Sequence, residues 1–250
     1  MREAVQGGLK IRLTGGSDGQ GGGDGPMVVL LHGFGAPGDD LVPLGDALDA
    51  PVGTRWVFPE APLSLDLGFG DARAWWLIDL ARIQADRAAG RIRDLSMEIP
   101  KGLDQARERL LTLLAELPKH VPMDYRKTVI GGFSQGAMLA CDGVLHSSYP
   151  FAGLVQLSSN LLARPIWEPL MSARNGLPVF QSHGTQDEIL PYLGAERLRD
   201  ALNRAGLSVQ WHNFNGGHEI PESVLIDLGA FLLRWLGESE RLPRSADQSR

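Results

Sequence analysis

Short apolar runs alternate with helix-like stretches along most of the 250-residue chain, and this pattern strongly constrains the fold. The run from Met27 to Leu31 is continuously apolar, as expected for a strand that is covered on both faces. In segment 101–117, by contrast, apolar residues recur at the spacing of one helix face. The segments that predict strands are 27–31, 54–62, 127–132, 151–159, 177–184 and 207–214, and those that predict helices are 101–117, 134–145, 194–206 and 221–236. This alternation predicts an α/β fold with a mostly parallel central sheet and helices on both faces.

We expect residues 1–250 to form a single domain, because the chain contains neither an internal repeat nor a linker. Glycine dominates residues 14–26, but they neither follow a predicted strand nor have a G-K-[ST] ending. A surface loop is therefore expected there rather than a phosphate-binding loop. Residues 79–98 are a candidate helical cover over a site, and the polar tail 237–250 is expected to fray.

Composition excludes several classes of protein. The formal net charge of −6 argues against nucleic acid or an anionic membrane as the main partner. The N-terminus lacks an apolar core of signal-peptide length, and no apolar segment is long enough to cross a bilayer. The single cysteine, Cys141, cannot form an intramolecular disulfide and is expected to be a packed core residue. We therefore expect a soluble, cytoplasmic protein.

The stretch VIGGFSQGAML (129–139) places a serine, Ser134, between two glycines, Gly132 and Gly136. An apolar run precedes this serine and a helix-compatible run follows it. A sharp strand-to-helix turn that holds a serine oxygen outward needs residues without Cβ on either side, which is the G-x-S-x-G nucleophile elbow. A tight turn with a capping serine would have the same short pattern, so a base and an acid must be found elsewhere.

Three of the six histidines, His32, His183 and His218, lie just beyond apolar runs. Sites in open parallel sheets form beyond the carboxyl ends of the strands, so these three are the candidate bases. In α/β-hydrolases the order along the chain is serine, acid, histidine. His218 fits that order with Asp187, which follows the predicted strand 177–184, and the adjacent Glu188 is the alternative acid. The predicted triad is Ser134, Asp187 and His218.

An acyl-transfer reaction also needs donors for the negative charge on the former carbonyl oxygen. The amide of Gln135 opens the helix after Ser134, where backbone N–H groups are unpaired. The glycine-rich loop LLHGFGAPGDD (30–40) supplies the second donor, for which we predict the amide of Phe34, with Gly35 as the alternative. Trp75, Trp76 and Leu161, together with Phe34, are the expected apolar walls of a substrate pocket.

Five segments together resemble the phospholipase/carboxylesterase family of α/β-hydrolases, which includes acyl-protein thioesterases and bacterial carboxylesterases. They are LLHGFGAPGDD (30–40), RAWW (73–76), GGFSQGAM (131–138), HGTQDEILP (183–191) and GGHEIP (216–221). The resemblance implies hydrolysis of esters or thioesters through an acyl-serine intermediate, without a metal or other cofactor. It assigns the same triad and the same two oxyanion amides. The chain departs from the family at Trp76-Leu77, where similar proteins often have Phe-Asp, and at segment 79–98.

The predicted function is therefore a serine carboxylesterase that acts on a small-molecule ester or thioester of short or medium acyl chain. Alternatives with the same triad are acyl-protein thioesterase, lysophospholipase, lipase or peptidase activity. A non-enzymatic ligand-binding protein of the same fold is the third hypothesis. The sequence leaves open whether the chain is a monomer or a homodimer.

Overall fold

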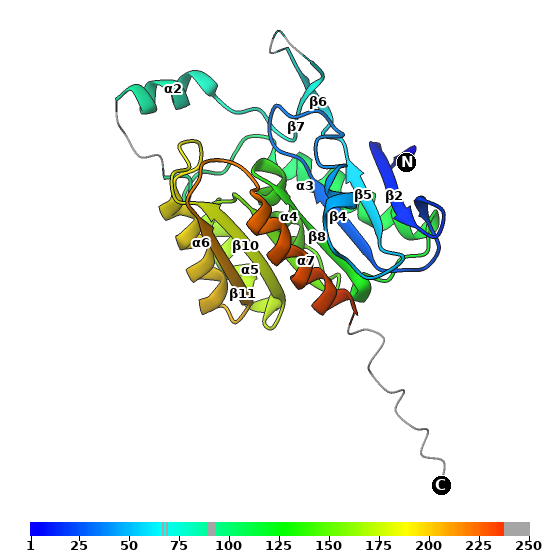
Figure 1. Ribbon diagram of the computed structural model, residues 1–250. Helices are drawn as coiled ribbons and strands as arrows, with labels where there is room; N and C mark the ends of the chain where they lie inside the picture. Colours follow the sequence, from blue (N-terminus) through cyan, green and yellow to red (C-terminus); the bar gives the residue numbers. More distant parts are fainter. Residues whose placement is uncertain (67, 69, 90–93, 238–250) are drawn as a thin grey trace.

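A nine-stranded sheet forms the centre of the molecule in the computed structural model, which describes residues 1–66, 68, 70–89 and 94–237 (Figure 1). The strand order is β1-β2-β5-β4-β8-β9-β10-β11, with β3 paired to β2. Strands β5, β4, β8, β9, β10 and β11 pair in parallel in that order, whereas β1 and β2 add an antiparallel edge. The strands are β1 (Arg2–Gln6), β2 (Leu9–Gly16), β3 (Gln20–Gly22), β4 (Met27–Leu31), β5 (Arg55–Pro59), β8 (Thr128–Phe133), β9 (Gly153–Leu157), β10 (Pro178–Gly184) and β11 (Ser208–Phe214). The predicted α/β fold with a mostly parallel sheet is confirmed.

Helices cover both faces of this sheet, which explains why the central strands β4, β9 and β10 are buried along their whole length. One apolar core lies between the sheet and helices α3, α4, α5 and α6, and the other lies under α7 and the segment around α1 (Figure 1). All five residues of β4 and of β9 are buried. The helices are α1 (Leu44–Ala47), α2 (Leu80–Ala88), α3 (Leu103–Glu116), α4 (Gln135–His146), α5 (Arg164–Met171), α6 (Tyr192–Arg204) and α7 (Glu222–Gly237). In the described part of the chain, none of them is both long and apolar enough to span a bilayer.

The glycine-rich segment 14–26 differs from the expected surface loop. Its first residues complete β2, and Gln20–Gly22 forms the short strand β3 beside it. The two backbones approach so closely that a Cβ on Gly16 would lie 2.2 Å from the carbonyl oxygen of Gly22. Glycine is thus required here for strand contact, and its abundance does not indicate a free loop.

Three further elements were not expected from the sequence. The N-terminal strands β1 and β2 form a hairpin through the two-residue turn Gly7–Gly8. A separate two-stranded sheet joins β6 (Leu63–Leu65) to β7 (Ala72–Ala74). Helix α5 contains Pro169, and proline inside a helix obscures its pattern in the sequence.

The candidate cover segment 79–98 contains α2, whose first turn is capped by a hydrogen bond from the Arg82 amide to Asp79 Oδ1 at 2.9 Å. Residues 90–93 of this segment lie outside the described residues. The predicted frayed tail 237–250 likewise lies outside them, apart from Gly237 at the end of α7.

Candidate active site

Ser134 occupies the single residue between β8 and α4, and its backbone has the strained conformation that this sharp turn requires. Its φ is 55° and its ψ is −119°, a region that residues with a side chain rarely adopt. A Cβ on Gly132 or Gly136 would lie 2.3 or 2.1 Å from the carbonyl oxygen of Leu31 on the neighbouring strand. The two flanking glycines therefore allow the turn to pack against β4, as the G-x-S-x-G pattern predicts.

Ser134, His218 and Asp187 come together in one hydrogen-bonded row at the carboxyl end of the sheet. His218 Nε2 lies 2.9 Å from Ser134 Oγ, and His218 Nδ1 lies 2.7 Å from Asp187 Oδ2. An ionised Asp187 only accepts, so Nδ1 carries the proton of a neutral imidazole and Nε2 is free to accept from the serine hydroxyl. The structure thus brings together the three residues that the sequence singled out, from three separate strand ends.

The carboxylate of Asp187 is held by several donors. Its Oδ1 accepts hydrogen bonds from the amides of Ile189 and Leu190, at 2.8 and 2.9 Å. Burial acts to raise the pKa of Asp187, but the hydrogen bond and charge of His218, followed by the Leu190 amide, lower the pKa below its ordinary value. Asp187 is therefore ionised at neutral pH. Glu188, the alternative acid, is exposed, whereas Asp187 is buried.

The two predicted oxyanion donors differ from the alternative donor in their hydrogen bonding. The amide of Gly35 already donates to the carbonyl of Arg73 at 2.8 Å, which removes it as an alternative. Within the described residues, the amides of Phe34 and Gln135 have no hydrogen-bond acceptor. Both residues line the same cavity as Ser134. Phe34 and Gln135 therefore remain the predicted donors.

A buried network holds the Phe34 loop against the nucleophile turn. The Gln135 side chain accepts from the Trp75 amide at 2.9 Å and donates to the Trp76 carbonyl at 2.8 Å. The Trp75 indole donates to the carbonyl of His32 at 2.9 Å. His32 Nε2 accepts from the amide of Ala61 at 3.0 Å, so this imidazole is neutral and protonated on Nδ1. His32 thus fixes the backbone rather than acting as a base.

Ser134 and His218 open onto a largely apolar cavity of about 350 Å³. Phe34 and Trp76 line it, and Arg82 and Ile83 of α2 contribute to its wall, so segment 79–98 remains a candidate cover. The sequence did not identify several apolar lining residues, which come from α2, from α4 and from loops whose apolar side chains resemble ordinary core residues. They are Leu77, Ile78, Ile83, Leu95, Met138, Leu162, Ile189 and Leu190.

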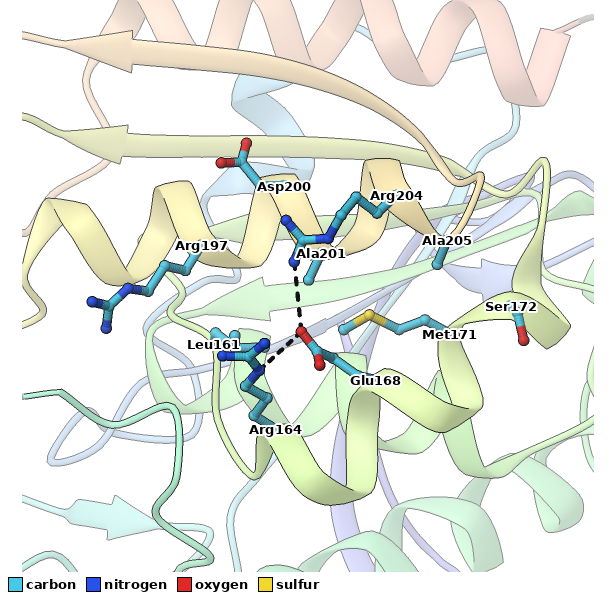
Figure 2. Close-up of a pocket in the computed structure, with 10 residues that line it drawn as sticks. All are labelled: Leu161, Arg164, Glu168, Met171, Ser172, Arg197, Asp200, Ala201, Arg204 and Ala205. Carbon is cyan, nitrogen blue, oxygen red and sulfur yellow. Dashed lines mark ion pairs between the residues drawn. The ribbon is translucent and has the colours of Figure 1, made fainter.

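Trp75 and Leu161 do not line this cavity, contrary to prediction. Trp75 is 2% exposed, and its indole donates a hydrogen bond to the carbonyl of His32 rather than facing the cavity. Leu161 lies instead at a cavity of about 550 Å³ between α5 and α6 (Figure 2). There Glu168 pairs with Arg164 at 3.0 Å and with Arg204 at 3.6 Å.

In the described parts of the chain, no three His, Cys, Asp or Glu side chains are grouped so that they could hold a metal ion. The thiol of Cys141 is fully buried, and burial raises its pKa, so it packs as a small apolar residue.

A nucleophile elbow, a hydrogen-bonded serine–histidine–aspartate row and a mostly parallel sheet with helices on both faces define an α/β-hydrolase. The family model described as phospholipase/carboxylesterase matches residues 22–236. The chain belongs to the phospholipase/carboxylesterase family and is a serine hydrolase that acts on ester bonds.

Individual relatives agree with this assignment. Acyl-protein thioesterase 1 of Eremothecium gossypii is 30% identical over 227 residues, which cover 87% of this chain and 91% of the relative. The crystal structure of esterase PE8 is similar with a TM-score of 0.70 and 29% identity, covering 90% of this chain and all of that chain. The Bacillus cereus carboxylesterase, with a TM-score of 0.68 and 21% identity over 91% of this chain and 94% of that chain, shares the fold.

Proposed function

We propose that this protein is a carboxylesterase that hydrolyses esters of short or medium acyl chain through an acyl-serine intermediate. Ser134 is the nucleophile, His218 the general base and acid, and Asp187 the group that orients His218. The observation that carries the proposal is the hydrogen-bonded row from Asp187 through His218 to Ser134, which ends in an apolar cavity.

In the first half of the reaction, Ser134 Oγ attacks the ester carbonyl carbon while its proton moves to His218 Nε2. Negative charge on the former carbonyl oxygen is stabilised by the amides of Phe34 and Gln135. Loss of one such donor typically lowers kcat by roughly 10²–10³-fold. The tetrahedral intermediate collapses when His218 gives its proton to the departing alkoxide oxygen, which leaves an acyl-serine and an alcohol.

In the second half, water replaces the alcohol. His218 removes a proton from this water as the water oxygen attacks the acyl carbon, and the same proton then returns to Ser134 Oγ. The carboxylic acid leaves and the resting serine is restored. Asp187 stays ionised throughout and stabilises the imidazolium that forms in each half-reaction.

Acyl-protein thioesterase activity is the second candidate. It is favoured by the similarity to relatives of that name, and the same acyl-serine chemistry serves a thioester. The cavity walls are mainly apolar side chains, which suits the acyl group in either case.

The test is a panel of p-nitrophenyl esters from acetate to palmitate, measured beside an acylated-cysteine peptide, with Ser134→Ala as the control. The proposal expects the highest kcat/KM on an ester of short or medium chain, and loss of all turnover in Ser134→Ala. A higher kcat/KM on the thioester peptide would favour the second candidate. Undiminished turnover in Ser134→Ala would reject both.

A further inference from the structure

Asp187 contacts two histidines: His218, which faces Ser134, and His183. It is the penultimate residue of β10 and its side chain is fully buried. His183 Nε2 lies 2.8 Å from the carbonyl oxygen of Leu190 and 3.3 Å from Asp187 Oδ2. The same Oδ2 accepts from His218 Nδ1, so the two imidazoles share one carboxylate oxygen.

The protonation of His183 follows from its partners. A backbone carbonyl can only accept, so Nε2 must carry a proton, which it donates to Leu190, and the carboxylate of Asp187 lies 3.3 Å from the same nitrogen. Nδ1 is buried and has no hydrogen-bond partner in the described residues. Burial also lowers the pKa of His183, and this outweighs the hydrogen bond to Leu190 and the charge of Asp187. His183 is therefore a neutral, permanent N–H donor.

His183 also closes the turn that carries Asp187. The amide of Leu190 donates to Asp187 Oδ1 while the carbonyl of Leu190 accepts from His183. The amide and the carbonyl of Leu190 are thus both hydrogen-bonded, and both oxygens of the Asp187 carboxylate accept hydrogen bonds. Its Oδ1 is fixed by the turn, and its Oδ2 lies between the two imidazoles.

We propose that His183 is a positioning residue for hydrolysis. It holds the turn 187–190 and keeps the negative charge of Asp187 at the oxygen that faces His218. This inference rests on the proposed function, because it assigns His183 a role only through Asp187 and His218. Without this donor, Asp187 orients the general base less well, while the substrate cavity walls other than Leu190 keep their contacts.

Two variants of the full-length enzyme test the role. His183→Phe keeps a ring of similar shape but removes the donor, and His183→Gln retains an N–H near the position of Nε2. We expect His183→Phe to lower kcat by about tenfold or more with KM nearly unchanged, and His183→Gln to recover much of that loss. Unchanged kcat in His183→Phe would overturn the inference, as would equal losses in the two variants.

A double-mutant cycle separates positioning from a general structural defect. If His183 acts through Asp187, then His183→Phe should change kcat little when Asp187 is already replaced by asparagine. The same loss in both backgrounds would overturn the inference. Turnover that survives in Ser134→Ala would instead reject the proposed function, so the two failures are distinguishable.

A measurement on the unaltered protein covers the case in which His183→Phe fails to fold. The ¹⁵N resonances of labelled histidine should give His183 as a neutral tautomer protonated on Nε2 at about pH 8, and its titration should occur at a lower pH than that of a free imidazole. A tautomer protonated on Nδ1, or titration near about 6.5, would contradict the proposed role.

Discussion

Asp142 and Asp187 are both carboxylates with fully buried side chains, yet they lie in very different surroundings. Asp142 lies in the middle of α4, where it accepts from the Trp167 indole at 2.8 Å and from Arg107 Nη1 at 3.0 Å. Asp187 lies in the turn after β10, where it accepts two backbone amides and a histidine. Burial and full hydrogen bonding are therefore common to both residues.

The nearby histidines show what differs between the two regions. His146 Nδ1 hydrogen-bonds the backbone oxygen of Asp142 at 2.8 Å. His146 is the last residue of α4, and this helix begins at the carboxyl end of β8 and leads away from it. His218 instead hydrogen-bonds both Asp187 and Ser134, and it borders the cavity. A buried carboxylate thus indicates catalysis only where it orients a base toward a nucleophile at the carboxyl edge of the sheet.

The largest expected effect comes from removing the base. His218→Ala should lower kcat by about 10⁵–10⁶-fold, because Ser134 then has no acceptor for its proton. The melting temperature should change little, and His146→Ala, the matched histidine beside Asp142, should leave kcat unchanged. The test is ester hydrolysis beside thermal unfolding of each variant. Near-normal turnover in His218→Ala would transfer the role of base to another residue.

The same substitution in the two carboxylates should have opposite consequences. Asp187→Asn should lower kcat by on the order of 10⁴-fold, because an amide favours the wrong imidazole tautomer. Asp142→Asn should leave kcat unchanged but lower the free energy of unfolding by about 2–5 kcal/mol, because Arg107 loses its buried charged partner. Kinetics and urea unfolding of both variants make the comparison. Equal kinetic losses would remove the distinction between the two regions.

Stability should fall in mild acid because of two buried neutral histidines. Burial lowers the pKa values of His32 and His183, so below about pH 6.5 the unfolded chain binds protons that the folded chain does not. The free energy of unfolding is therefore highest above about pH 6.5. It decreases as the pH falls toward the pKa values of the two histidines in the folded protein, by at most about 1.4 kcal/mol per pH unit for each histidine.

Urea unfolding between pH 7.5 and 5 measures this slope. His183→Gln should make the dependence shallower by up to one proton, since glutamine does not titrate. An identical slope in the variant would mean that His183 keeps an ordinary pKa in the folded protein.

The smallest effect concerns the two cavities. Arg82 of α2 lines the cavity at Ser134 and pairs with Glu98 at 3.5 Å, while Arg164 pairs with Glu168 in the cavity between α5 and α6 (Figure 2). Arg82→Ala should make one wall more apolar and raise kcat/KM for longer esters relative to acetate by about 2–4-fold. Arg164→Ala should leave this ratio unchanged. Equal ratios in the two variants would mean that α2 does not influence acyl-chain preference.

Much of the fold could be predicted from local pattern. Apolar runs that alternate with helix-like stretches predicted the parallel sheet, and β4 is the clearest case because all five of its residues are apolar and buried. Chain order and strand-end position selected Ser134, Asp187 and His218, which the structure brings within hydrogen-bonding distance.

Features that depend on contacts between distant segments could not be predicted in this way. The glycines of segment 14–26 suggested a loop because the close approach of β2 and β3 is visible only after folding. Trp75 and Trp76 are adjacent and chemically alike, but the Trp75 indole bonds the carbonyl of His32, which is distant in the chain, while Trp76 lines the cavity. The contact of His183 with Asp187 likewise depends on how the turn closes.

Labelling with a fluorophosphonate probe tests the identity of the nucleophile most directly. The probe reacts with a serine oxygen only when a neighbouring base activates that oxygen. We predict one adduct per chain, located on Ser134 by tandem mass spectrometry and lost in both Ser134→Ala and His218→Ala. An adduct on another residue, or labelling that persists in Ser134→Ala, would contradict the assignment of Ser134 as the attacking group.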